Sequence, residues 1–164
     1  MVKKVKSNSR NKLTLKTKSS HTRVPEKLAE LLANTYALYL KTQNFHWNVT
    51  GPTFCMLHTF FEDQYKELAA AIDVIAERIR ALGEIAPGSF KEFAALSHIK
   101  DALSRKNSEE MIKELAADHH TLITLINTNL PLIEKFRDDV TQGLLIERLS
   151  AHEKTLWMLN SLLE

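Results

Sequence analysis

The chain has 164 residues, the size of one domain, and 44% of them are hydrophobic, enough to build a sizeable core. Cys55 is the only cysteine, which excludes an intrachain disulfide and favours a cytoplasmic protein. No apolar run approaches the roughly 18 residues that span a bilayer, so we expect no membrane partner.

The net charge of +2 conceals a strong asymmetry along the chain. Residues 1–23 carry 8 Lys or Arg and no acid, whereas the rest carries 14 basic and 20 acidic side chains. Residues 1–22 have too few apolar side chains to fold, so we expect a disordered basic arm before a folded domain at residues 23–164. Such an arm suits non-specific, salt-sensitive contacts with DNA phosphates, and a tail that only aids solubility is the alternative. Its cations are Lys3, Lys4, Lys6, Arg10, Lys12, Lys16 and Lys18.

The folded part is predicted to contain four long helices and one short one. Only 4 Gly and 4 Pro interrupt the chain, and they stand mainly between apolar segments of helical period. The long helices are expected at about residues 25–49 and 54–82, from 107 onwards and from 138 to 163, and the short one at 89–96. This pattern predicts an all-α four-helix bundle with a short helical crossover.

The second of these helices carries four side chains suited to metal binding, His58, Glu62, Asp73 and Glu77. At 100° per residue they fall within about 100° of the helix circumference and form one stripe. The 19 residues from His58 to Glu77 correspond to roughly 28 Å, so one ion cannot be held by both ends. The helix therefore offers two half-sites, each an i,i+4 pair. Ordinary polar positions on an amphipathic helix are the alternative.

The spacing of the four side chains suggests how the half-sites meet. The residue numbers of His58 and Glu77 add up to 135, as do those of Glu62 and Asp73. A two-fold axis crossing the middle of the helix would therefore set each half-site opposite the complementary half-site of a second copy. A symmetric homodimer of this kind completes two metal sites, each shared between chains.

His46 lies near the end of the first long helix, one short loop before the second helix begins. Its side chain is expected to reach the end of the second helix that carries His58 and Glu62. The shared site then offers two imidazoles and three carboxylates, which suit Fe(II) and also accept Zn(II) or Mn(II). No Glu in the chain stands three residues before a His, so the Glu-x-x-His pairs of di-iron sites inside one bundle are absent. That absence agrees with an interfacial site.

The segment 46–54 (HWNVTGPTF), followed by Leu57-His58, Glu62, Asp73 and Glu77-Arg78, resembles the Dps family, the DNA-binding proteins from starved cells or mini-ferritins. Residues 151–159 (AHEKTLWML) are similar to that family too. The resemblance implies a ferritin-like bundle in a hollow shell of twelve subunits. It also implies a ferroxidase that oxidises Fe(II), preferably with hydrogen peroxide, stores ferric iron and binds DNA non-specifically, protecting it from oxidative damage.

The resemblance assigns roles to particular residues. The ferroxidase ligands at the two-fold interfaces would be His46, His58, Glu62, Asp73 and Glu77. Many relatives have Asp where this chain has Glu62, whose longer arm is expected to alter the metal spacing. Trp47 is expected to quench radicals or to pack as an interface or core aromatic.

The resemblance also implies an iron entry pore on three-fold axes and a cellular location. Asp138 and Asp139 lie where that pore is expected, although Gly143 replaces a further Asp of many relatives. A cytoplasmic protein associated with the nucleoid is expected. Two rival functions stay open, a mainly DNA-compacting protein with weak ferroxidase activity and an iron store without DNA binding.

Five other residues receive ordinary structural interpretations. His119 and His120 are adjacent and face different ways, so both are expected at the surface or only lightly buried. His98 is expected to be a solvated loop residue. Cys55 is interpreted as a small apolar filler, and Trp157 as a packing residue.

Overall fold

The structure, a computed structural model, describes residues 23–102 and 105–164, and these residues are helical throughout except for turns and connections. The expected basic arm and its cations lie outside the described residues. The helices are α1 (Arg23–Asn48), α2 (Phe54–Ala81), α3 (Phe90–Leu96), α4 (Ser108–Lys135) and α5 (Asp139–Ser161). The predicted all-α bundle with a short crossover helix is therefore confirmed. Among the described helices, none has the length and apolar character needed to cross a membrane.

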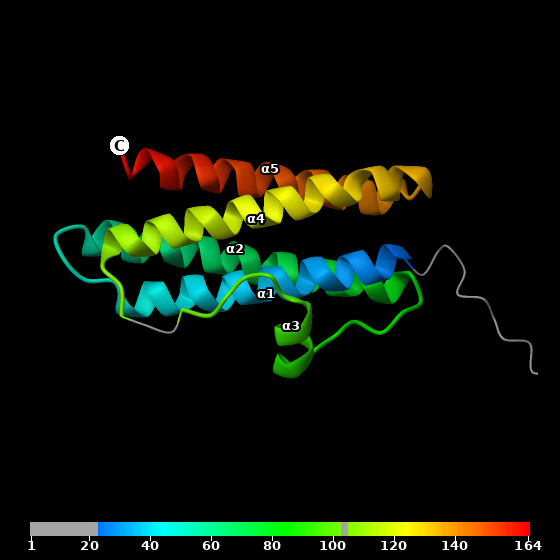
Figure 1. Ribbon diagram of the computed structural model, residues 1–164, viewed down its shortest axis with the longest axis horizontal. Coiled ribbons are helices and arrows are strands. Elements are labelled where there is room, and N and C mark those ends of the chain that lie inside the picture. The colour runs from blue at the N-terminus through cyan, green and yellow to red at the C-terminus, as the bar shows by residue number, and fades with distance from the viewer. Residues whose placement is uncertain (1–22, 103–104) are drawn as a thin grey trace, which may run out of the picture.

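The four long helices form two layers, α1 with α2 and α4 with α5, and α3 stands apart on the crossover between them (Figure 1). Apolar side chains from all four meet in one core that includes Leu38, Leu57, Leu115 and Leu159. The turn from α1 to α2 depends on Gly51, whose φ of 104° lies in the left-handed region that side chains disfavour. This tight turn brings the end of α1 beside the start of α2.

The helix starts follow local capping chemistry. Ser89 begins α3 and Asn107 begins α4, each accepting a hydrogen bond from the backbone N–H three residues on. In return, the carboxylates of Glu92 and Glu110 accept from the backbone N–H of these capping residues. Both starts agree with the sequence prediction, because a capping box is readable from four residues.

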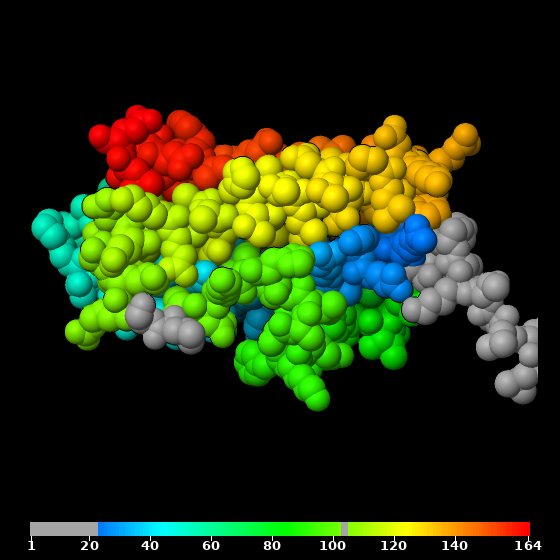
Figure 2. All heavy atoms as spheres, viewed as in Figure 1, coloured from blue at the N-terminus to red at the C-terminus, as the bar shows by residue number. Residues whose placement is uncertain are grey.

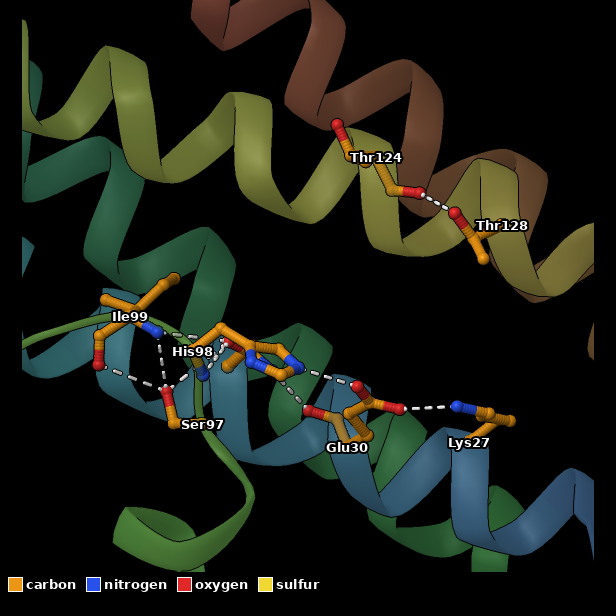
Figure 3. A network of polar contacts seen from close by, with 8 residues as sticks. Lys27, Glu30, Ser97, His98, Ile99, Thr124 and Thr128 are labelled. Atoms are coloured by element: carbon orange, nitrogen blue, oxygen red, sulfur yellow. Dashed lines mark hydrogen bonds and ion pairs between the residues drawn. The ribbon is translucent and has the colours of Figure 1, made fainter.

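The connection after α3 is fastened to α1 by polar contacts. The Asn34 side-chain oxygen accepts from the backbone N–H of His98 at 2.8 Å and of Ile99 at 3.3 Å. Figure 3 shows Glu30 between two basic partners, Lys27 at 2.9 Å and the His98 ring at 2.7 Å. His98 is exposed, as expected, but its ring pairs with Glu30 as well as facing solvent, and no local sequence pattern indicates that contact.

The bundle interior contains a buried histidine pair, and the interpretation of one member, His119, as a surface or only lightly buried residue is wrong. His120 is exposed, as expected. His119 of α4 is only 2% exposed, and its Nδ1 lies 3.0 Å from Nδ1 of His152 on α5. Burial lowers the pKa of His119 to about 3, with a smaller contribution from the nearby Arg148 cation. Burial, His119 and Arg148 likewise lower the pKa of His152. His119 faces inward because it shares the helix face of Leu115 and Leu122, which are fully buried.

Two further interpretations are wrong for the isolated chain. Trp157 is 66% exposed rather than packed, and Cys55 is exposed rather than a filler. Other large apolar side chains are also exposed, among them Ile85 and Phe90 near α3, a region that projects from the body in Figure 2.

Candidate metal centre

The site forms where α1 ends and α2 begins. His46 lies in the last turn of α1 and His58 in the first turns of α2, and the Gly51 turn folds the two segments together. Their rings stack with centroids 3.8 Å apart and planes inclined by 21°. The ring of Tyr65 meets His46 edge-on at 5.2 Å, and Phe54 lies 5.1 Å from His58. Each imidazole therefore packs against the other and against one further aromatic ring.

Each histidine is oriented by the backbone of the other. Nδ1 of His46 donates to the carbonyl oxygen of His58 at 2.7 Å, and Nδ1 of His58 donates to the carbonyl oxygen of His46 at 2.8 Å. Because a carbonyl oxygen only accepts, each Nδ1 must carry the proton. In the neutral rings the lone pair is then on Nε2, the nitrogen available to a metal ion.

Glu62 lies one helical turn beyond His58 and completes a group of three potential ligands. One ligand atom from each of His46, His58 and Glu62 lies within 4.8 Å of the other two, and no other group of three or more such residues occurs in residues 23–102 and 105–164. The hydrogen bond from Lys66 is the main cause that lowers the pKa of Glu62, and its charge adds to the effect. The carboxylate is therefore anionic at neutral pH and suited to a divalent ion.

The other two predicted ligands, Asp73 and Glu77, are not part of this group. Both are exposed on α2, and Asp73 follows Glu62 by 11 residues, or roughly 16 Å along the helix. One chain therefore assembles three of the five predicted ligands and presents the remaining two on a face that no other described segment covers. Completion of the site by a second copy stays a prediction.

The remaining predicted functional residues lie as follows. Trp47 is 62% exposed, which excludes a place in the core of this chain. Asp138 caps α5 through Thr141 and also pairs with Arg78 at 2.6 Å, whereas Asp139 is exposed. Burial raises the pKa of Asp138, but the bonds from Thr141 and Arg78 outweigh burial and lower it. A role of these two carboxylates in iron entry stays a prediction.

Sequence reasoning missed one charged residue, Lys66, on the metal stripe, the face of α2 that carries His58, Glu62, Asp73 and Glu77. The Lys66 ammonium lies 2.5 Å from a Glu62 oxygen, in an i,i+4 pair on α2. The spacing that identified the half-sites also identifies this pair, because a lysine four residues after a glutamate shares its helix face.

The fold and this site define a ferritin-like helical bundle with a candidate carboxylate–histidine metal site. The Ferritin family model, described as a ferritin-like domain, matches residues 25–164. On this evidence, and on the relatives below, the chain belongs to the Dps mini-ferritins of the ferritin-like family.

Relatives and solved structures cover nearly the whole folded part. DNA protection during starvation protein 2 from Bacillus anthracis is 34% identical over 140 residues, covering 85% of this chain and 96% of the relative. The crystal structure of a Dps protein from Bacillus brevis is 32% identical, with a TM-score of 0.87 over 89% of this chain and 98% of that one. A Dps protein from Vibrio cholerae O1, described as a ferritin-like diiron-carboxylate protein, is 30% identical, with a TM-score of 0.85 over 88% and 91%.

Proposed function

We propose that this protein is a ferroxidase that oxidises Fe(II), preferably with hydrogen peroxide, and stores the ferric product. The observation that carries this proposal is the group of His46, His58 and Glu62, with both Nε2 atoms free to ligate. Imidazole and carboxylate together suit Fe(II), and a carboxylate favours the higher charge of Fe(III). The residues present therefore favour loss of an electron from bound iron.

We propose further that Asp73 and Glu77 of a second copy complete each site across a two-fold axis. Two observations support this proposal. These carboxylates are exposed in the single chain, and their four-residue spacing mirrors that of His58 and Glu62. Val74, between them on α2, is 51% exposed, which suits a face covered by another subunit. Twelve subunits forming a hollow shell would then carry sites at each two-fold interface.

The proposed reaction oxidises two irons together, so that the electrons they lose match the electrons that hydrogen peroxide takes up. Each Fe(II) gives up one electron, and the pair reduces one hydrogen peroxide to two waters with uptake of two protons. Delivery of both electrons together avoids release of hydroxyl radical. The chain would contribute the ligands that hold the ions and Trp47, next to His46 in the sequence, as a group able to quench stray radicals. Zn(II) or Mn(II) would fit the same ligands and compete with iron.

Two features outside the metal centre belong to the same proposal. Asp138 and Asp139 would attract Fe(II) at an entry pore, although Asp138 is already engaged by Arg78. The basic arm of residues 1–22 would bind DNA non-specifically, and we propose a location in the cytoplasm with the nucleoid. The name of the Bacillus anthracis relative, a DNA protection protein, agrees with this role.

Complementation between two inactive variants tests the shared site. Asp73→Ala removes a ligand from one half-site, and the double variant His46→Ala/His58→Ala removes two from the other. We expect each variant alone to lose fast Fe(II) oxidation. Co-refolding the two should restore part of the activity, because some interfaces regain an intact set of ligands. No recovery in assemblies shown to contain both variants would contradict a site shared between chains.

A further inference from the structure

Lys66 lies on the metal stripe between the two half-sites. On the helical wheel of α2 its side chain falls within about 40° of both Glu62 and Asp73. The hydrogen bond and charge of Glu62 raise the pKa of Lys66, and the charge of Asp63, three residues before Lys66, is a minor further cause. Glu67 pairs instead with Arg148. Its ammonium lies 2.5 Å from Oε1 of Glu62. One of the two oxygens that Glu62 offers to a metal is therefore already held by a cation.

We propose that the Lys66 ammonium competes with the metal ion for the Glu62 carboxylate. The ammonium must leave Glu62 before both carboxylate oxygens can bind iron. This inference rests on the proposed ferroxidase site and adds a residue that regulates its loading. The ammonium and the metal ion compete for the same oxygen, and each repels the other as long as both are present.

The charge balance indicates what this competition achieves. His46 and His58 are neutral ligands, so Glu62 supplies the only negative charge of the half-site within one chain, and Lys66 cancels it. A net-neutral half-site attracts a divalent cation weakly. Asp73 and Glu77 of a second copy would add two negative charges and outweigh the lysine. Lys66 therefore makes tight metal binding depend on assembly of the complete site.

The size of the effect follows from simple electrostatics. An ammonium about 7 Å from a divalent ion, in a water-like dielectric and with partial screening by salt, changes the affinity about three- to tenfold. The effect should weaken at high ionic strength, because screening acts on charges at this separation. An uncharged side chain of similar length at position 66 should tighten metal binding by that factor.

The experiment is a titration of the assembled, full-length protein with Co(II) under argon, since Co(II) is a redox-stable probe of Fe(II) ligands. The binding constant is measured by calorimetry and by the visible absorption of bound Co(II), in about 50 mM and 500 mM salt. Lys66→Gln removes the charge and Lys66→Arg retains it. Lys113→Gln is the matched control, because Lys113 makes a 2.5 Å i,i+4 pair with Glu109 on α4 and has a similarly exposed side chain.

We expect Lys66→Gln to bind Co(II) about three- to tenfold more tightly at low salt, with a smaller gain at high salt. Lys66→Arg and Lys113→Gln should match the unsubstituted protein. Unchanged or weaker binding by Lys66→Gln would overturn the inference, as would an equal gain for Lys113→Gln.

His58→Ala separates this inference from the proposed function. If His58→Ala abolishes Co(II) binding while Lys66→Gln changes nothing, the metal centre stands and the competitor role fails. If His58→Ala leaves Co(II) binding intact, the proposed metal centre itself fails, and with it the inference. Circular dichroism and particle size verify that each variant is folded and assembled.

Discussion

The buried pair of His119 and His152 predicts that the protein loses stability as the pH falls below about 6.5. Between that value and the folded-state pKa of about 3 for His119, the unfolded chain binds a proton that the folded chain does not. Stability therefore rises with pH in this window, is fully present above it and is lost as the pH falls through it. From pH 6 to pH 4, His119 alone should cost about 2–3 kcal/mol, and His152 adds to the loss.

Chemical denaturation at fixed protein concentration, repeated from pH 7 to pH 4, measures this loss. Surface carboxylates also contribute to the pH dependence, so the relevant quantity is the difference from His119→Gln/His152→Gln. That variant keeps two buried hydrogen-bonding side chains but does not titrate. We expect its free energy of unfolding to fall less steeply with acidification than that of the unsubstituted protein. Equal slopes would refute the reasoning, because they would mean that burial does not hold the pair neutral.

Two further predictions concern a buried ion pair and the basic arm. The Lys41 ammonium is 3% exposed and pairs with Asp118 at 2.7 Å and with Glu114 at 2.9 Å. Lys41→Met should destabilise the bundle by about 3 kcal/mol because it leaves the buried Asp118 carboxylate without its cation, whereas Glu114 keeps its ion pair with Lys106. A thermal unfolding curve identical to that of the unsubstituted protein would contradict this. Deletion of residues 1–22 should lower DNA retention about tenfold or more at low salt while leaving Fe(II) oxidation unchanged. Gel-shift and oxidation assays on the same preparation test both, and undiminished DNA retention would favour an iron store without DNA binding.

The fold was largely predictable because its signals are local. Helix starts such as Asn107 depend on residues within one turn, and the breaks after α1 and α2 coincide with Gly51 and Gly83. The three ligands that one chain brings together were also accessible from sequence. His46 and His58 are separated by a short turn, and His58 and Glu62 by one helical turn.

The sequence was less informative wherever contacts join distant segments. The contact between His119 and His152 depends on how α4 packs on α5, and no spacing within either helix indicates it. Trp157 stands in an apolar segment of α5. Which side of that segment is buried and which is exposed depends on how the bundle packs. The pair of Lys66 and Glu62 was within reach of sequence reasoning, since it repeats the i,i+4 spacing of the half-sites.

The most direct test of the account is Fe(II) oxidation by the assembled protein, followed by absorbance with and without hydrogen peroxide, in air and under argon. We expect fast peroxide-driven oxidation that leaves a soluble ferric product, and loss of that fast phase in His58→Ala. Oxidation no faster than in buffer would contradict the assignment of the His46, His58 and Glu62 group as a ferroxidase centre. The DNA-compacting function would then be favoured.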